Sequence, residues 1–133
     1  MKFILLASMA LIIAALIAPF AIESAFANNH GDTKYNSWIQ YRSVSYTDAR
    51  EKLDATSSWD VCHSGPNHKV EVFATGWGWN PQYVGSHAYY YGPGSQGYLT
   101  NFVNENGYPR ALLWLSESNH GGAITGVWSP DSI

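Results

Sequence analysis

The apolar residues of this chain recur in short segments that alternate with polar residues, and no long window has the spacing of an amphipathic helix. Clusters rich in Gly, Pro, Asn and Ser separate these segments, as in SGPN, GPGS, NENG and SNHGG. Such clusters are typical of turns between strands. The pattern predicts strands at 35–46, 48–53, 58–63, 68–79, 86–91, 97–104, 110–116 and 123–128.

Eight short strands at this spacing favour an all-β domain, built as a small antiparallel β-sandwich, with a small barrel as the alternative. One segment is ambiguous, because Asp48 and Glu51 in DAREKLD (residues 48–54) have the spacing of a helix capping box. The segment is too short for a stable isolated helix and lies between predicted strands, so we assign it to strand.

Residues 1–27 have the features of a cleaved signal peptide. Lys2 precedes a long apolar run, and small residues at Ala25 and Ala27 form the A-x-A pattern found before a cleavage site. The run is just long enough to span a bilayer, so a retained membrane helix is the alternative. Because no basic cluster follows the run, we favour cleavage after Ala27. We therefore expect a secreted protein with one mature domain at 28–133 and no stable membrane insertion.

The charge and cysteine content restrict the partners further. Seven Lys and Arg residues stand against ten Asp and Glu residues, which gives a formal net charge of −3, and no basic block occurs. This composition argues against nucleic acid and anionic membranes as partners. Cys62 is the single cysteine, so the domain can form no internal disulfide and must gain its stability from packing. The unpaired thiol could form an intermolecular disulfide.

The densest aromatic segment begins with TGWGWN and continues through HAYYYGPG. If 68–79 and 86–91 form a hairpin, strand alternation places Trp77 opposite Tyr89 on one face. Gly76 and Gly78 then lie on the inward face, where Tyr90 covers their bare backbone. This register predicts an outward row of rings, which we take as candidate ligand-binding residues: Trp77, Trp79, Tyr89 and Tyr91. The predicted core residues are Trp59, Tyr90, Leu113, Leu115 and Trp128.

Such a row has three interpretations. Aromatic rings stack on the apolar faces of sugars, and they also form the centres of protein-binding surfaces. The third interpretation is structural, with the row buried against neighbouring elements.

Residues 60–68 gather Asp60, Cys62, His63 and His68, but their spacing matches neither a zinc site nor a nucleophile beside its base. The chain also lacks a marked pair of carboxylates for glycoside hydrolysis, a phosphate-binding glycine loop and a nucleophile elbow. We therefore expect no enzyme activity, no catalytic residues, no metal site and no cofactor.

Two segments carry a family resemblance. Residues 49–61 (AREKLDATSSWDV) are similar to an Arg-(Gln/Glu)-turn-Trp-x-Val stretch, and residues 111–132 are similar to a closing pattern of strand, Asn-rich turn and strand ending in Gly-x-Trp. Both patterns occur in a family of small exported proteins of Gram-positive bacteria that is classed as a domain of unknown function. The resemblance implies a secreted, β-rich single domain without an assigned activity. The chain departs from the family pattern in Cys62 and in its three consecutive tyrosines.

These features together predict a secreted, non-enzymatic binding module. Its partner would be a protein or a cell-envelope polysaccharide, contacted through the aromatic row. In size, export and β-content the chain also resembles lactococcin 972-type bacteriocins, so a secreted antimicrobial protein is an alternative. The negative charge stands against that alternative, because agents that attack anionic envelopes are usually basic. A hydrolase built on Cys62 and a histidine is the remaining alternative.

Overall fold

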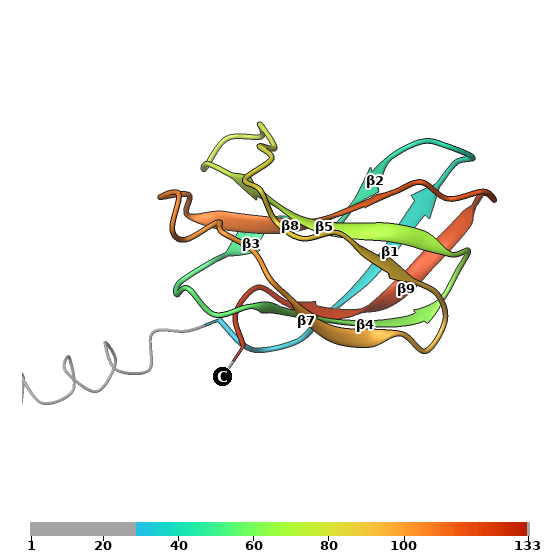
Figure 1. The fold of residues 1–133 in the computed structure, drawn as a ribbon, viewed down its shortest axis with the longest axis horizontal. Coiled ribbons are helices and arrows are strands. Elements are labelled where there is room, and N and C mark those ends of the chain that lie inside the picture. The colour runs from blue at the N-terminus through green and yellow to red at the C-terminus, as the bar shows by residue number, and fades with distance from the viewer. Residues whose placement is uncertain (1–28, 133) are drawn as a thin grey trace, which may run out of the picture.

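The computed structural model describes residues 29–132, and the predicted signal peptide at 1–27 lies outside the described residues. Within the described part of the chain, the strands form two antiparallel sheets that pack face to face (Figure 1). The two sheets remain separate, so the prediction of a β-sandwich is confirmed and the barrel alternative is wrong. Across residues 29–132 there is no helix long and apolar enough to cross a membrane.

Each sheet combines strands that are far apart in the sequence. The first sheet has the order β1 (Thr33–Ile39), β9 (Gly122–Ser129), β4 (Ser58–Ser64) and β7 (Gln96–Leu99). The second sheet has the order β2 (Ser45–Tyr46), β8 (Arg110–Ser116), β5 (His68–Thr75) and β6 (Tyr89–Tyr91), and β3 (Arg50–Glu51) also pairs with β8. The ambiguous segment 48–54 therefore contains a short strand and no helix.

Strand alternation places the core between the two sheets. On β8 the inward residues are Ala111, Leu113 and Leu115, and they lie opposite Ala74, Val72 and Val70 of β5. Residues from the first sheet, including Ile39, Leu99, Ile124 and Trp128, close the core from the other side. All of these side chains are buried. The predicted core positions Leu113, Leu115 and Trp128 are confirmed.

Two of the predicted core rings are not in the core. The Trp59 side chain is half-buried and lies on the outer face of the first sheet, with its ring centroid 4.9 Å from that of Tyr98. The inward positions on either side of it on β4 are Ser58 and Asp60, which are both buried. Tyr90 is 74 % exposed, because the observed pairing of β5 and β6 turns its side chain outward.

A buried tyrosine–carboxylate pair lies inside the sandwich. Tyr35 Oη donates a hydrogen bond to Asp60 Oδ1 at 2.7 Å. Gly126 permits this contact, since a Cβ there would lie 2.1 Å from the carbonyl oxygen of Val61 and 2.6 Å from Tyr35 Oη. Burial raises the pKa of Asp60 to about 7, although the hydrogen bond from Tyr35 acts in the opposite direction.

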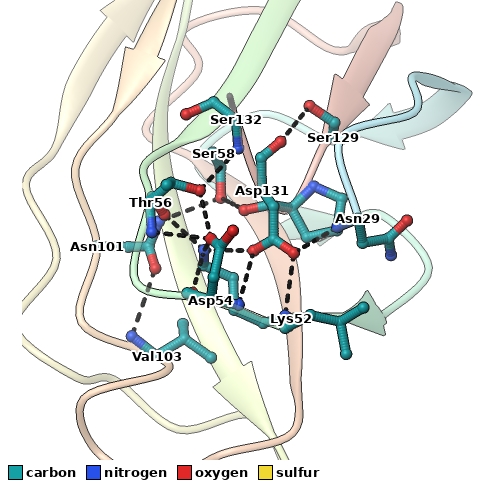
Figure 2. A network of polar contacts seen from close by, with 12 residues as sticks. Asn29, Lys52, Asp54, Thr56, Ser58, Asn101, Val103, Ser129, Asp131 and Ser132 are labelled. Atoms are coloured by element: carbon teal, nitrogen blue, oxygen red, sulfur yellow. Dashed lines mark hydrogen bonds and ion pairs between the residues drawn. The ribbon is translucent and has the colours of Figure 1, made fainter. Parts of the chain in front are cut away.

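A buried ion pair joins the end of the chain to the segment after β3 (Figure 2). The Lys52 ammonium lies 2.6 Å from Asp131 Oδ1, and both side chains are fully buried. Its two remaining N–H groups reach the carbonyl oxygens of Asp54 at 2.8 Å and Thr56 at 2.5 Å. The charge of Lys52 is therefore compensated and its donors are all used, as burial of an ammonium requires.

The same aspartate holds the first described residue in place. Asp131 Oδ2 accepts hydrogen bonds from the backbone N–H of Asn29 at 2.7 Å and of Leu53 at 3.0 Å. In return, the backbone N–H of Asp131 donates to the carbonyl oxygen of Asn29 at 3.1 Å. One carboxylate thus joins three distant segments of the chain.

Asp131→Asn should destabilise the protein strongly, because the buried Lys52 ammonium loses its closest counter-charge and keeps only the partly exposed Asp54 carboxylate, 3.7 Å away. Breaking a buried ion pair in this way typically costs about 3–5 kcal/mol of unfolding free energy. Urea unfolding followed by circular dichroism measures the change. Asp48→Asn, at an exposed position, is the matched control and should change stability by less than about 0.5 kcal/mol. Similar losses in both variants would contradict this account of the ion pair.

The raised pKa of Asp60 predicts a dependence of stability on pH. Between about pH 4 and pH 7 the folded protein retains a proton on Asp60 that the unfolded chain releases. The contribution of Asp60 to stability is therefore complete below about pH 4 and is lost as the pH rises through 7. Asp60→Asn cannot titrate and keeps an oxygen for Tyr35.

Unfolding free energies of the native protein and of Asp60→Asn across pH 4–8 test this prediction. The native protein should lose stability relative to the variant as the pH rises, by about 1.4 kcal/mol for each unit of pKa difference. The comparison cancels the other titrating groups, including His68, whose buried side chain has a lowered pKa and acts in the opposite sense. Parallel pH profiles would rule out the Asp60 assignment.

Candidate aromatic binding face

The outer face of the second sheet carries a continuous row of aromatic rings. Trp114 of β8 stacks on Phe73 of β5, with ring centroids 4.4 Å apart and planes 4° from parallel. On its other side Trp114 stacks on Tyr46 of β2 at 5.9 Å. The row continues from Tyr46 to Trp79 at 4.7 Å and from Phe73 to Tyr83 at 5.9 Å.

We call this surface the aromatic face and include in it Tyr46, Phe73, Trp77, Trp79, Tyr83 and Trp114. Four of its rings are exposed: Trp77 at 69 %, Tyr83 at 64 %, Trp79 at 54 % and Tyr46 at 48 %. Phe73 and Trp114 are half-buried beneath them. Monomeric proteins rarely expose a contiguous apolar patch without a use for it, so this face is the candidate functional site.

The connection between β5 and β6, residues 76–88, supplies three of the rings and projects above the second sheet (Figure 1). Two backbone hydrogen bonds between Ala74 and Gln82, at 2.9 and 2.7 Å, fold its first part back onto the end of β5. The Thr75 hydroxyl adds a bond to the carbonyl oxygen of Gly78 at 2.9 Å. The two tryptophans therefore stand on a closed turn.

Arg110 fastens this turn from the neighbouring strand. Its guanidinium donates hydrogen bonds to the carbonyl oxygen of Gly76 at 2.7 and 2.9 Å and to that of Trp77 at 3.0 Å. The same group lies 5.7 Å from the centre of the Trp77 ring, within the range of a cation–π contact. Arg110 can do this because it faces Thr75, the last residue of β5, in the sheet register.

The predicted aromatic row is correct for the tryptophans and wrong for the tyrosines. Trp77 and Trp79 are exposed, but Tyr91 is only 8 % exposed and its ring lies in the core. Tyr89 is half-buried and packs against the core, where its hydroxyl accepts a hydrogen bond from the backbone N–H of Thr100 at 3.1 Å. The outward tyrosine of the three is Tyr90.

The error lies in the register of the hairpin. Tyr90 pairs with Lys69 at the start of β5, whereas the prediction paired the tyrosines with the tryptophan segment beyond its end. A shift by an odd number of residues exchanges the two faces of a strand. Gly76 and Gly78 lie in the turn, and a Cβ at either position would meet no atom within 4 Å, so these glycines need no covering ring.

Four members of the aromatic face were missed as site residues: Tyr46, Phe73, Tyr83 and Trp114. The sequence signal for two of them is strand alternation, which already places Phe73 and Trp114 on the faces opposite their buried neighbours. What was missing is the pairing of β5 with β8, which brings these two rings onto one surface.

The polar cluster at residues 60–68 is divided by the fold. Cys62 is fully buried, and burial together with the nearby Asp60 carboxylate raises the pKa of its thiol to about 11. His63 points outward from the same strand, and His68 lies on β5 in the other sheet. Across residues 29–132, no three His, Cys, Asp or Glu side chains gather as metal ligands. The burial of Cys62 argues against the predicted intermolecular disulfide.

Comparison with known proteins identifies a family and no closer relative. A family model described as Protein of unknown function (DUF2712) matches residues 23–132, which is most of the chain. No curated protein and no solved structure matches the chain. The family assignment agrees with the resemblance seen in the sequence, whereas the Gram-positive origin and the bacteriocin likeness stay predictions.

Arg110→Lys should loosen the turn that carries the tryptophans. Lysine keeps the positive charge, but its single ammonium cannot reproduce the planar fork that reaches the carbonyl oxygens of Gly76 and Trp77. Hydrogen–deuterium exchange of residues 76–82 should become faster, while exchange in β4 and β9 stays unchanged. Unchanged exchange in the turn would show that Arg110 does not fasten it.

Proposed function

We propose that this chain, which belongs to the DUF2712 family of proteins of unknown function, is a secreted, non-enzymatic binding module. Its aromatic face binds an extended polysaccharide of the cell envelope. The observation that carries the proposal is the row of five rings in contact that crosses the outer face of the second sheet. Secretion rests on the signal-peptide features of residues 1–27.

The shape of the row favours an extended ligand. Each ring of the row contacts the next one, so a bound chain would meet them in succession. Aromatic faces carry a partial negative charge that attracts the C–H groups on the apolar faces of sugar rings. The exposed rings of Tyr83 and Tyr46 already contact Phe73 and Trp114, so they lose little conformational freedom on binding. The face is thus suited to a repetitive partner whose sugars are uncharged where they contact the rings.

Charge supports the same class of partner. The cations closest to the row are already occupied, since Arg110 binds the turn and Lys69 lies 3.0 Å from Glu71. Within residues 29–132, the cations of the two strands that carry Phe73 and Trp114 are therefore not available to an anionic polymer on the rings. The antimicrobial alternative rests on size and export, and no contact in the described residues favours it over binding.

Removal of both exposed tryptophans of the aromatic face should abolish binding without unfolding the protein. The mature chain should be retained on insoluble cell-wall polysaccharide at high salt, because stacking is not screened by ions. Trp77→Ala/Trp79→Ala should lose this retention while its melting temperature stays within a few degrees of the native value. Sedimentation of the protein with the insoluble polysaccharide measures the bound fraction.

Trp38→Ala is the matched control, since Trp38 is as exposed as Trp77 but lies on β1 in the other sheet. It should keep full retention. Equal losses in the control and the double variant would overturn the assignment of the face. Retention that disappears after the wall is stripped of protein would indicate a protein partner in place of the polysaccharide.

A further inference from the structure

A second surface lies at the end of the sandwich where four connections meet, at 40–44, 65–67, 92–95 and 117–121 (Figure 1). An open groove of about 1120 Å³ lies between these connections. Its lining includes Arg42, Asn67, His68, Tyr90, Glu117 and Asn119. None of these residues belongs to the aromatic face, so the groove is a separate site.

The backbone is strained at two points on the rim of this groove. Arg42 has a φ of 54° and Glu117 has a φ of 52°, and they are the two non-glycine residues with positive φ within residues 29–132. The N–H of Arg42 donates to the carbonyl oxygen of Ser118 at 3.0 Å, which joins the two connections. Non-glycine residues in this conformation are uncommon and persist where the surrounding structure imposes them, often at binding sites.

The charged groups of Glu117 and Arg42 differ in whether they have an oppositely charged partner. Glu117 accepts hydrogen bonds from Lys69 Nζ and from Tyr90 Oη, both at 3.2 Å, and these contacts lower the pKa of its carboxyl group. The guanidinium of Arg42 lies 5.1 Å from the Tyr41 ring and contacts no carboxylate within the described part of the chain. The groove therefore offers one exposed cation that is not paired.

The neutral groups of the groove are suited to hydroxyls. The side-chain amides of Asn67 and Asn119 make no hydrogen bond with the rest of the described chain. His68 Nδ1 lies 2.9 Å from the carbonyl oxygen of Pro66, so Nδ1 carries the proton and Nε2 presents a lone pair. Nε2 is buried and has no hydrogen-bond partner among the described residues. Such a nitrogen can accept a hydrogen bond from a hydroxyl group.

We propose that this groove binds a sugar that bears a carboxylate. The guanidinium of Arg42 pairs with the carboxylate, for which its planar fork is matched, and the asparagine amides bind ring hydroxyls. The exposed ring of Tyr90 provides a stacking surface at the rim. A single unpaired cation fits a singly charged carboxylate better than a phosphate, which favours several cations.

The groove adjoins the aromatic face without sharing its residues. Ser116 of the groove and Trp114 of the face both lie on β8, two residues apart, which is about 7 Å along a strand. A polysaccharide that lies across the rings can therefore place an acidic sugar in the groove. The groove proposal nevertheless stands on its own residues, whether or not the face binds a ligand.

Calorimetric titration of the mature protein with two matched probes tests the proposal. The probes are the trimer of galacturonic acid and its methyl ester, in which each carboxylate is replaced by an uncharged ester group, and N-acetylmuramic acid serves as a second acidic sugar. We expect at least one acidic sugar to bind about tenfold more tightly than its uncharged counterpart at low salt. Raising the salt concentration should reduce this difference. Equal binding of acid and ester, or no binding of either acid at millimolar concentration, would overturn the proposal.

Arg42→Asn removes the cation without adding backbone strain, because asparagine tolerates positive φ. It should erase the preference for the acid, and Arg42→Lys should restore part of it. Lys34→Gln removes one exposed positive charge from β1 and should leave the preference intact. An Arg42→Asn variant that binds the acid as the native protein does would refute the role of Arg42.

Two further measurements separate the groove from neighbouring explanations. Trp77→Ala/Trp79→Ala should keep the acid preference, so failure of the aromatic face and failure of the groove give different results. Inorganic phosphate should compete weakly with the acidic sugar. Tighter binding of phosphate than of either sugar acid would identify the groove as a phosphate site and overturn the sugar assignment.

Discussion

The pairing of β5 with β8 determines both faces of the second sheet. On the inner face it sets Val72 against Leu113 in the core. On the outer face the same register brings Phe73 beside Trp114, so their rings stack. At one end of the pair Arg110 reaches the turn that carries the tryptophans, and at the other end the strand leads to Glu117 in the groove. A shift of one residue would exchange the two faces and remove the core and the aromatic face together.

Alternation within one strand could be predicted from the sequence, whereas pairing between strands could not. The run ALLWL on β8 showed that Leu113 and Leu115 share a face and that Trp114 lies on the other. The prediction for the tyrosine strand β6 was wrong. The long connection 76–88 leaves the register of β6 against β5 undetermined, whereas a tight hairpin turn would fix it. The exposure of Trp77 was correct for a different reason from the one given, since it follows from the turn and not from a continued strand.

The buried polar contacts were also beyond prediction, because they join residues far apart in the sequence. Lys52 and Asp131 are 79 positions apart, and Tyr35 and Asp60 are 25 apart. From the sequence, the lysine within DAREKLD would be assigned to the surface. Only the fold brings Asp131 into contact with it and buries it. In a domain whose described part holds one buried, unpaired cysteine, these contacts join distant segments that a disulfide would join elsewhere.

The two candidate surfaces supply different physical contributions to recognition. Stacking on the aromatic face has little directional preference, so it can hold a polysaccharide in many positions along its length. A guanidinium–carboxylate pair has a fixed geometry, so it favours the binding of one sugar in one orientation. Because the groove begins one pleat beyond Trp114, a bound chain that slides along the rings would stop where its acidic sugar meets Arg42. The fold would then combine the affinity of the face with the selectivity of the groove at the adjoining end of the sandwich.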